Sequence, residues 1–221
     1  MALRYTISNN GLQLLQDFLE LTPHPSISDE LRDVIFVAID IENLGNIKQD
    51  SAQKLDSQVG IAILDTRILA SSQPEKTILT STTKNFLFGK TTTIRQQDIL
   101  TTLESLVPRT RNIALIGHEF KHDLHVLQIL KFDLQTSIFG ILDTQKIASD
   151  LLPDNSSTLS DILQALQCPF DKLHTASNDA HFTLRALLLL AKKSYTHFLI
   201  NTRNQDTLAS IRAIAQVPVL E

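Results

Sequence analysis

The sequence contains a single cysteine, Cys168, so no disulfide can form within the chain. A lone thiol is typical of a reducing compartment. No apolar run approaches the roughly 20 residues that span a bilayer, and the longest one, around Leu184–Ala191, is far shorter. The opening residues also lack the basic stretch and apolar core of a secretory signal. These absences exclude a membrane-spanning helix and favour a cytoplasmic or nuclear protein.

An excess of basic residues is also missing, since 20 Lys and Arg face 24 Asp and Glu, for a net charge of −4. There is no general positive field, so any surface that binds nucleic acid must be local. Apolar residues make up 43% of the sequence and charged residues 20%, as in a folded globular protein. A chain of 221 residues is long enough for one sizeable domain.

The most informative stretch is Val34–Glu42, which reads VIFVAIDIE. Its apolar start is typical of a strand that is covered on both faces. Because side chains alternate along a strand, Asp40 and Glu42 share one face near its end. Two carboxylates that close repel each other unless a proton or a cation neutralises them. A divalent cation held by oxygen ligands is the natural partner, although a lone Asp-x-Glu is more often a solvated strand end.

Hydrophobic periodicity predicts the remaining elements. Strands are expected at Gln58–Asp65, Thr77–Thr83, Asn112–Ile116 and Ser137–Leu142. Helices are expected over Leu12–Leu19, Gln96–Val107, from His118, through Ile147–Leu152 after a cap at Asp143-Thr144, and at Thr158–Leu166, Asn178–Lys192 and Thr207–Ala215. Three neighbouring strands followed by alternating strands and helices predict an α/β fold with a five-stranded mixed sheet. The first three strands would be antiparallel and the later ones parallel, with helices on both faces.

A second candidate acid lies in Gly117–Leu127, GHEFKHDLHVL. A strand that ends in glycine and leads into a helix places Asp123 at the end of the sheet where α/β proteins bind ligands. The same stretch contains His118, Glu119 and His122, the H-E-x-x-H spacing of zinc proteases. We reject that interpretation because His118 falls at the helix start and no third zinc ligand has an obvious source.

The third element is His174–Ala180, HTASNDA. His174 belongs to the turn before the long final helix, and Asp179 belongs to the helix's first turn, where the helix dipole favours an acid. Taken alone, Asp179 would be an ordinary helix cap and His174 a surface histidine. The order of the three elements is more specific than any one of them.

That order resembles the DEDDh 3′–5′ exonuclease family, which has the ribonuclease H-like fold. The resemblance extends from Val34 to Leu190 and is greatest to a fungal subgroup of exonuclease-like proteins. It implies a single exonuclease-like domain over residues 1–221, with an N-terminal helix in 1–30, a catalytic core in 34–190 and a C-terminal extension in 194–221. The five functional positions of the family fall on Asp40, Glu42, Asp123, His174 and Asp179.

The resemblance implies that Asp40, Glu42, Asp123 and Asp179 hold two Mg²⁺ or Mn²⁺ ions, and that His174 is the general base. The expected substrate is the single-stranded 3′ end of RNA or DNA. Phe120 and Lys121 are candidates for contacting it, as are Lys48 and Lys54.

Two departures from the family pattern leave an alternative open. Asn43 stands where the family often has threonine, and Glu119 where it often has asparagine. The alternative is a catalytically weak or inactive exonuclease-like module that acts as a nucleic-acid-binding or protein-binding adaptor. Such a module could dock a protein partner through Ser194–Glu221.

Overall fold

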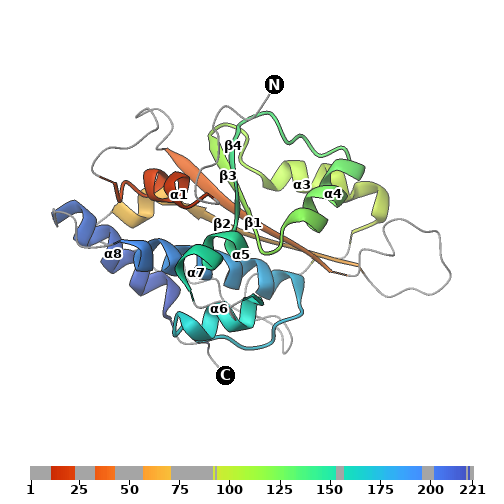
Figure 1. The fold of residues 1–221 in the computed structure, drawn as a ribbon. Coiled ribbons are helices and arrows are strands. Elements are labelled where there is room, and N and C mark those ends of the chain that lie inside the picture. Colours follow the sequence, from red (N-terminus) through yellow and green to blue (C-terminus); the bar gives the residue numbers. More distant parts are fainter. Residues whose placement is uncertain are drawn as a thin grey trace.

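The structure is a computed structural model that describes residues 11–22, 33–42, 57–70, 92, 94–152, 157–195, 202–217 and 219 (Figure 1). Its strands are β1 (Val34–Glu42), β2 (Gln58–Asp65), β3 (Asn112–Gly117) and β4 (Ile138–Asp143). Its α-helices are α1 (Leu12–Phe18), α3 (Ile99–Leu106), α4 (Lys121–Ile129), α5 (Thr144–Leu151), α6 (Leu159–Ala165), α7 (Ala176–Ser194) and α8 (Thr202–Ala215), with short 3₁₀ helices η3 (Thr66–Ala70) and η4 (Gln96–Asp98).

The strands form one mixed sheet in the order β2-β1-β3-β4. β1 pairs antiparallel with β2, whereas the β1–β3 and β3–β4 pairs are parallel. This confirms an α/β fold compatible with the ribonuclease H-like architecture. Among the described residues the sheet has four strands, whereas the sequence predicts five. The segment predicted as the additional antiparallel strand, Thr77–Thr83, lies outside the described residues.

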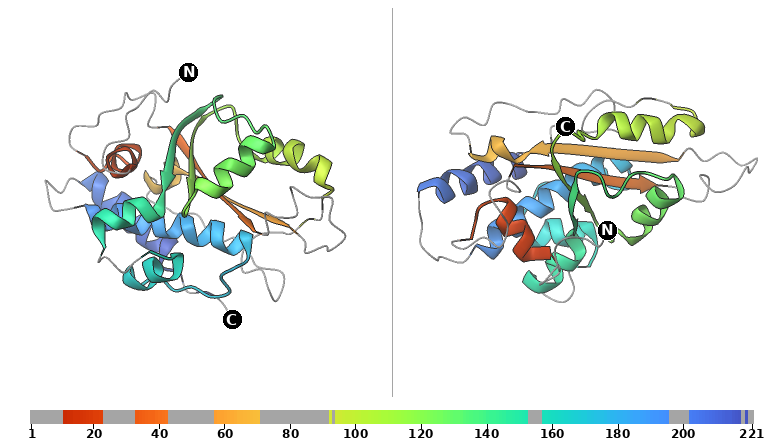
Figure 2. Two further views of the ribbon diagram at one scale, coloured as in Figure 1. Left: turned by 45° about the vertical axis from the view of Figure 1, so that its right-hand side comes forward. Right: turned by 90° about the horizontal axis from the view of Figure 1, so that it is seen from above.

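Helices cover both faces of the sheet, as the sequence predicts (Figure 2). The odd-numbered residues of β1, such as Ile35 and Val37, pack in one apolar cluster with residues of α3 and α4. The even-numbered residues Phe36 and Ala38 pack in a second cluster with residues of α1, α5, α6, α7 and α8. This burial on both sides explains why the strand starts with an unbroken apolar run.

Helix α7 is the central helix of the second layer. It packs against β1 and β2 on one side and against α5, α6 and α8 on the other. Its residues Leu187–Ala191 are all buried, which accounts for the long apolar run in the sequence. Within the described part of the chain, no helix combines the length and the apolar character needed to cross a membrane.

Candidate functional site

Asp40 and Glu42 extend the even-numbered face of β1 beyond its apolar part, so both lie on the side of the sheet that α7 covers. In the antiparallel register, Asp40 is opposite Gly60 and Glu42 is opposite Gln58. The side-chain oxygen of Gln58 accepts the backbone N–H of Ala176, at 3.4 Å. This contact joins the end of the β1–β2 pair to the start of α7.

Asp123 reaches the same place from α4. Its Oδ1 accepts the backbone N–H of Ile41 at 2.9 Å, beyond the last β1–β3 pair, Ala38 and Ile116. Asp123 thus satisfies a strand N–H that β3 no longer reaches, and it lies between the positions of Asp40 and Glu42 along β1. The carboxylate is buried, at 7% exposure.

The helix expected from His118 begins three residues later, at Lys121. The reason is a tight turn in which Glu119 has a left-handed backbone, with φ 51°. The backbone N–H groups of Glu119 and Phe120 donate to the side chain of Asp143. Asp123 therefore lies in the first turn of α4, not deeper in the helix.

Asp179 and His174 come from the start of α7. The backbone N–H of His174 donates to both carboxylate oxygens of Asp179, at 3.2 and 3.0 Å. His174 itself adopts a left-handed backbone, with φ 66°. The buried side chain of Asn178 donates to the carbonyl of Lys172 at 2.7 Å, which fixes the turn from which His174 projects.

We call Asp40, Glu42, Asp123 and Asp179 the carboxylate site. Burial raises the pKa of Asp40 from 3.8 to about 8, and the negative charges of Asp179, Asp123 and Glu42 act in the same direction. Burial also raises the pKa of Asp123 and of Asp179 to about 6. The four acids, which come from three distant parts of the sequence, therefore share one electrostatic environment.

The site has the properties of a divalent cation site. The Oδ2 atom of Asp40 is buried, and among the described residues it has no hydrogen-bond partner. Ligand atoms of Glu42, His174 and Asp179 all lie within 4.8 Å of one another. Carboxylate oxygens are the ligands that Mg²⁺ and Mn²⁺ prefer. A bound cation would both pair with the orphaned oxygen and offset the repulsion that raises the pKa values.

The H-E-x-x-H residues do not share a helix. His118 precedes α4, and its Nδ1 lies 3.0 Å from the hydroxyl of Thr144. His122 is exposed on the first turn of α4. The geometry agrees with the rejection of the zinc protease interpretation, because that motif requires both histidines within one helix.

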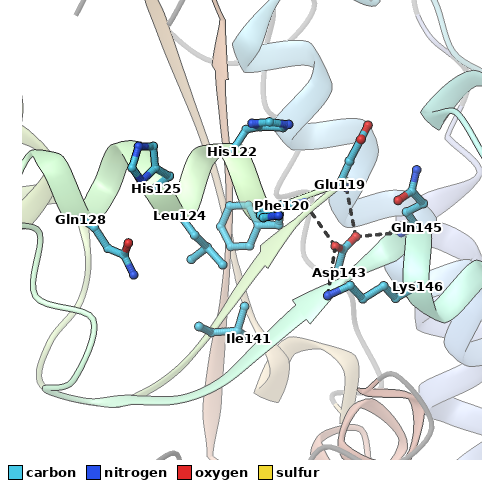
Figure 3. Close-up of a pocket in the computed structure, with 11 residues that line it drawn as sticks. Glu119, Phe120, His122, Leu124, His125, Gln128, Ile141, Asp143, Gln145 and Lys146 are labelled. Atoms are coloured by element: carbon cyan, nitrogen blue, oxygen red, sulfur yellow. Dashed lines mark hydrogen bonds and ion pairs between the residues drawn. The ribbon is translucent and has the colours of Figure 1, made fainter. Parts of the chain in front are cut away.

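A hollow of about 950 Å³ lies beside α4, near the end of β4 and the start of α5 (Figure 3). Its lining residues are Glu119, Phe120, Lys121, His122, Leu124, His125, Gln128, Ile141, Asp143, Gln145 and Lys146. The hollow and the carboxylate site share helix α4, since His122 and Leu124 flank Asp123 in the sequence, but none of the four acids lines the hollow. We refer to it below as the α4 hollow.

The two candidates for substrate contact that the structure describes differ in accessibility. Phe120 is 1% exposed and packs in the core, so its ring is not free to stack on a base. Lys121 is exposed and lines the α4 hollow. Lys48 and Lys54 lie outside the described residues.

Sequence reasoning missed the residues that hold the site together. Asp143 was recognised only as a helix cap, and it does accept the backbone N–H of Gln145 at the start of α5. Its hydrogen bonds to Glu119 and Phe120 join the end of β4 to the turn after β3. Asp143 lies 24 and 23 positions from these two residues in the sequence, so no local sequence pattern indicates the contact. Gln58 and Asn178 act through similar long-range or loop contacts.

Comparison with known proteins gives a family match. Residues 75–190 match the DEDDh family model described as DNA polymerase III subunit epsilon-like, C-terminal domain. The matched part contains Asp123, His174 and Asp179, while Asp40 and Glu42 precede it.

The chain is also similar to an uncharacterised nucleolar protein of Schizosaccharomyces pombe. It is 26% identical over 117 residues, which cover 49% of this chain and 47% of that protein. The alignment thus spans about half the length of the relative. With a family model that matches more than half of its residues, the chain belongs to the DEDDh exonuclease-like family, DNA polymerase III subunit epsilon-like.

Proposed function

We propose that this protein is a metal-dependent 3′–5′ exonuclease that hydrolyses phosphodiester bonds of RNA or DNA from the 3′ end. The observation that carries the proposal is the carboxylate site. Four acids from β1, α4 and α7 meet there, one of them with a buried, orphaned oxygen. Membership of the DEDDh family supports a nuclease function.

In this proposal Asp40, Glu42, Asp123 and Asp179 hold two Mg²⁺ or Mn²⁺ ions. Such ions supply the positive charge that stabilises the attacking and leaving oxygens of the scissile phosphate. His174 is exposed next to Glu42 and Asp179, where it can accept the proton of the attacking water. The backbone N–H of His174 donates to the carboxylate of Asp179, and this contact positions the proposed general base next to a proposed metal ligand.

The α4 hollow supports a local nucleic-acid surface on a chain whose net charge is −4. Lys121 and Lys146 line it and can contact phosphates, while Leu124 and Ile141 offer apolar surface. Glu119 and Asp143 also line the hollow, and Lys146 lies 4.0 Å from Asp143, so the positive charge of this surface is confined to the two lysines. The nucleolar description of the relative supports a nuclear location for this protein.

The proposal is tested with 5′-labelled single-stranded RNA and DNA oligomers in Mg²⁺, in Mn²⁺ and in EDTA. We expect a metal-dependent ladder that shortens from the 3′ end and that Asp40→Asn abolishes. His174→Ala should lower the rate by about 10²–10⁴-fold, as the loss of a general base does, without losing metal.

Two results would contradict this assignment. Full activity of Asp40→Asn would remove the carboxylate site from the reaction. Absence of cleavage in every metal, with folded protein, would favour the adaptor alternative, for which the exposed Glu119 at the α4 hollow is the supporting feature. A carboxylate there opposes the approach of phosphate groups.

A further inference from the structure

The turn between β3 and α4 is held by the side chain of Asp143, the last residue of β4. Its Oδ1 accepts the backbone N–H groups of Glu119 at 3.0 Å and Gln145 at 3.1 Å. Its Oδ2 accepts the N–H of Phe120 at 3.2 Å. Figure 3 shows these bonds converging on one carboxylate. Asp143 is 8% exposed, and besides these three N–H groups its Oδ2 lies 4.0 Å from the ammonium of Lys146.

The next residue, Thr144, holds the same turn from a second side. Its hydroxyl donates to the carbonyl of Gly117 at 3.2 Å and contacts Nδ1 of His118 at 3.0 Å. Thr144 is fully buried. Together, two consecutive residues of the β4–α5 corner contact each residue from Gly117 to Phe120.

The turn has little freedom to adopt this shape unaided. Glu119 has φ 51°, which is unfavourable for a residue with a side chain. The Phe120 ring folds back onto Gly117 so closely that a Cβ at Gly117 would lie 1.9 Å from it. Strained backbone persists where surrounding contacts over-determine it, and here those contacts come from Asp143 and Thr144.

The turn decides where α4 begins, and α4 carries Asp123 in its first turn. Asp123 must approach β1 closely enough to accept the N–H of Ile41, between Asp40 and Glu42. A shift of the turn would move the start of α4 away from β1, and it would separate Asp123 from the other acids of the carboxylate site.

We propose that Asp143 and Thr144 are positioning residues. They fix the Gly117–Phe120 turn and thereby set Asp123 against β1 in the carboxylate site. The proposal rests on the proposed function in that Asp123 is taken as a metal ligand. The side-chain contacts of the two residues among the described residues are with the turn, with Gln145 and with Lys146, and none is with an acid of the carboxylate site, so each would reach that site through the turn.

The test compares four variants of the full chain. Asp143→Asn leaves only one acceptor oxygen, and Thr144→Val removes the hydroxyl while keeping the side chain's shape. Thr144→Ser restores the hydroxyl. Asp161→Asn is the matched control, because Asp161 also supports a helix start, in the capping box with Thr158 at α6. Helix α6 packs on α5 and α7, and its start is close to the turn because Ser157 hydrogen-bonds to His118, so this control tests a nearby helix start that does not itself hold the turn.

Two readouts separate positioning from general stability. The first is Mn²⁺ affinity by calorimetry, which we expect to fall about 10-fold in Asp143→Asn and Thr144→Val, as for residues that orient metal ligands. The second is hydrogen exchange of the Ile41 amide, which should be faster in the same two variants. Thr144→Ser and Asp161→Asn should resemble the native protein in both.

Unchanged Mn²⁺ affinity and Ile41 exchange in Asp143→Asn and Thr144→Val would overturn the proposal. The same holds if Asp161→Asn changes both readouts equally, since the effect would then be general loss of stability. If the native protein binds no Mn²⁺, the proposed function fails. Exchange of the Ile41 amide then still decides whether Asp143 and Thr144 position Asp123.

Discussion

At the scale of single residues, Asp40 is the acid of the carboxylate site whose pKa is raised most, so its ionisation in the folded protein costs the most free energy. Burial and three neighbouring acids raise its pKa to about 8, above the value of about 6 for Asp123 and Asp179. Between pH 3.8 and about 8, the folded protein therefore retains a proton at Asp40 that the unfolded chain has released. The folded state binds more protons over this range, so its stability falls as the pH rises.

Asp40→Asn is therefore expected to stabilise the metal-free protein in alkaline solution. Asparagine keeps the shape of the side chain without the charge, and each unit of pKa shift corresponds to about 1.4 kcal/mol. We expect a gain in the free energy of unfolding of about 1–3 kcal/mol at about pH 8, after relaxation of the neighbouring acids. The gain should shrink to less than about 1 kcal/mol at about pH 4, because this is close to the unfolded pKa of 3.8 and the loss of stability has only begun there.

Urea unfolding in EDTA at both pH values measures this difference. Asp171→Asn is a suitable control, because Asp171 is exposed and accepts only the neighbouring N–H of Lys172. That variant should show no pH-dependent gain. If Asp40→Asn were less stable than the native protein at about pH 8, the ionised Asp40 would not destabilise the folded protein, which would contradict the prediction.

The sequence predicts the acids of the carboxylate site as a set from the order of three motifs, which resembles the DEDDh family, and their metal-binding role stays a prediction. Alternation along a strand places Asp40 and Glu42 on one face, and the first turn of a helix favours an acid such as Asp179. No local pattern marks the long-range contact of Asp123 with Ile41. Which oxygen of the site is orphaned also depends on packing from several elements, and the sequence does not encode it locally.

At the scale of elements, the approach of α7 to the sheet brings Asp179 to the strand that carries Asp40. The contact depends on Gly60 of β2, the register partner of Asp40. A Cβ at Gly60 would lie 1.9 Å from the carbonyl oxygen of Ala176, in the first turn of α7. Helix backbone therefore rests directly on strand backbone, and no side chain fits between them.

Gly60→Ala should be strongly destabilising, by about 3 kcal/mol or more, because the atom in conflict is backbone that no rotamer change can move. Gly140→Ala is the matched control in β4. There the nearest atom is the side-chain Cδ2 of Leu14, at 2.9 Å, which can shift. We expect that variant to lose about 1 kcal/mol or less. Urea unfolding of both variants gives the comparison, and equal losses would contradict a backbone contact at Gly60.

The sequence predicted most elements of the fold but not their boundaries at the site. Apolar periodicity located the strands and helices that bury a continuous face. The start of α4 was misplaced at His118, because the left-handed turn at Glu119 is stabilised by residues of the β4–α5 corner. Four of the five predicted strands are present in the sheet of the described residues, and the fifth, Thr77–Thr83, lies outside them.

At the scale of the whole molecule, a protein with net charge −4 must bind a polyanion through a local surface. The α4 hollow lies beside the helix that carries Asp123 and has a lysine on each of two sides, Lys121 at the start of α4 and Lys146 on α5. A strand whose 3′ end is at the carboxylate site could continue into it. Lys121 and Lys146 would then contact phosphates upstream of the scissile bond.

Lys121→Ala and Lys146→Ala are therefore expected to weaken the binding of a single-stranded oligomer of about eight nucleotides, measured by fluorescence anisotropy in an Asp40→Asn background. Each variant should lower the slope of log affinity against log salt by about 0.7, the value for one phosphate contact on a single strand. A dinucleotide should bind with unchanged affinity, since it does not extend beyond the carboxylate site. Lys193→Ala, an exposed lysine near the opposite end of α7 from Asp179, is the control. Equal losses for the dinucleotide, or an equal change of slope in Lys193→Ala, would show that the lysines act through overall charge and that the strand follows another path.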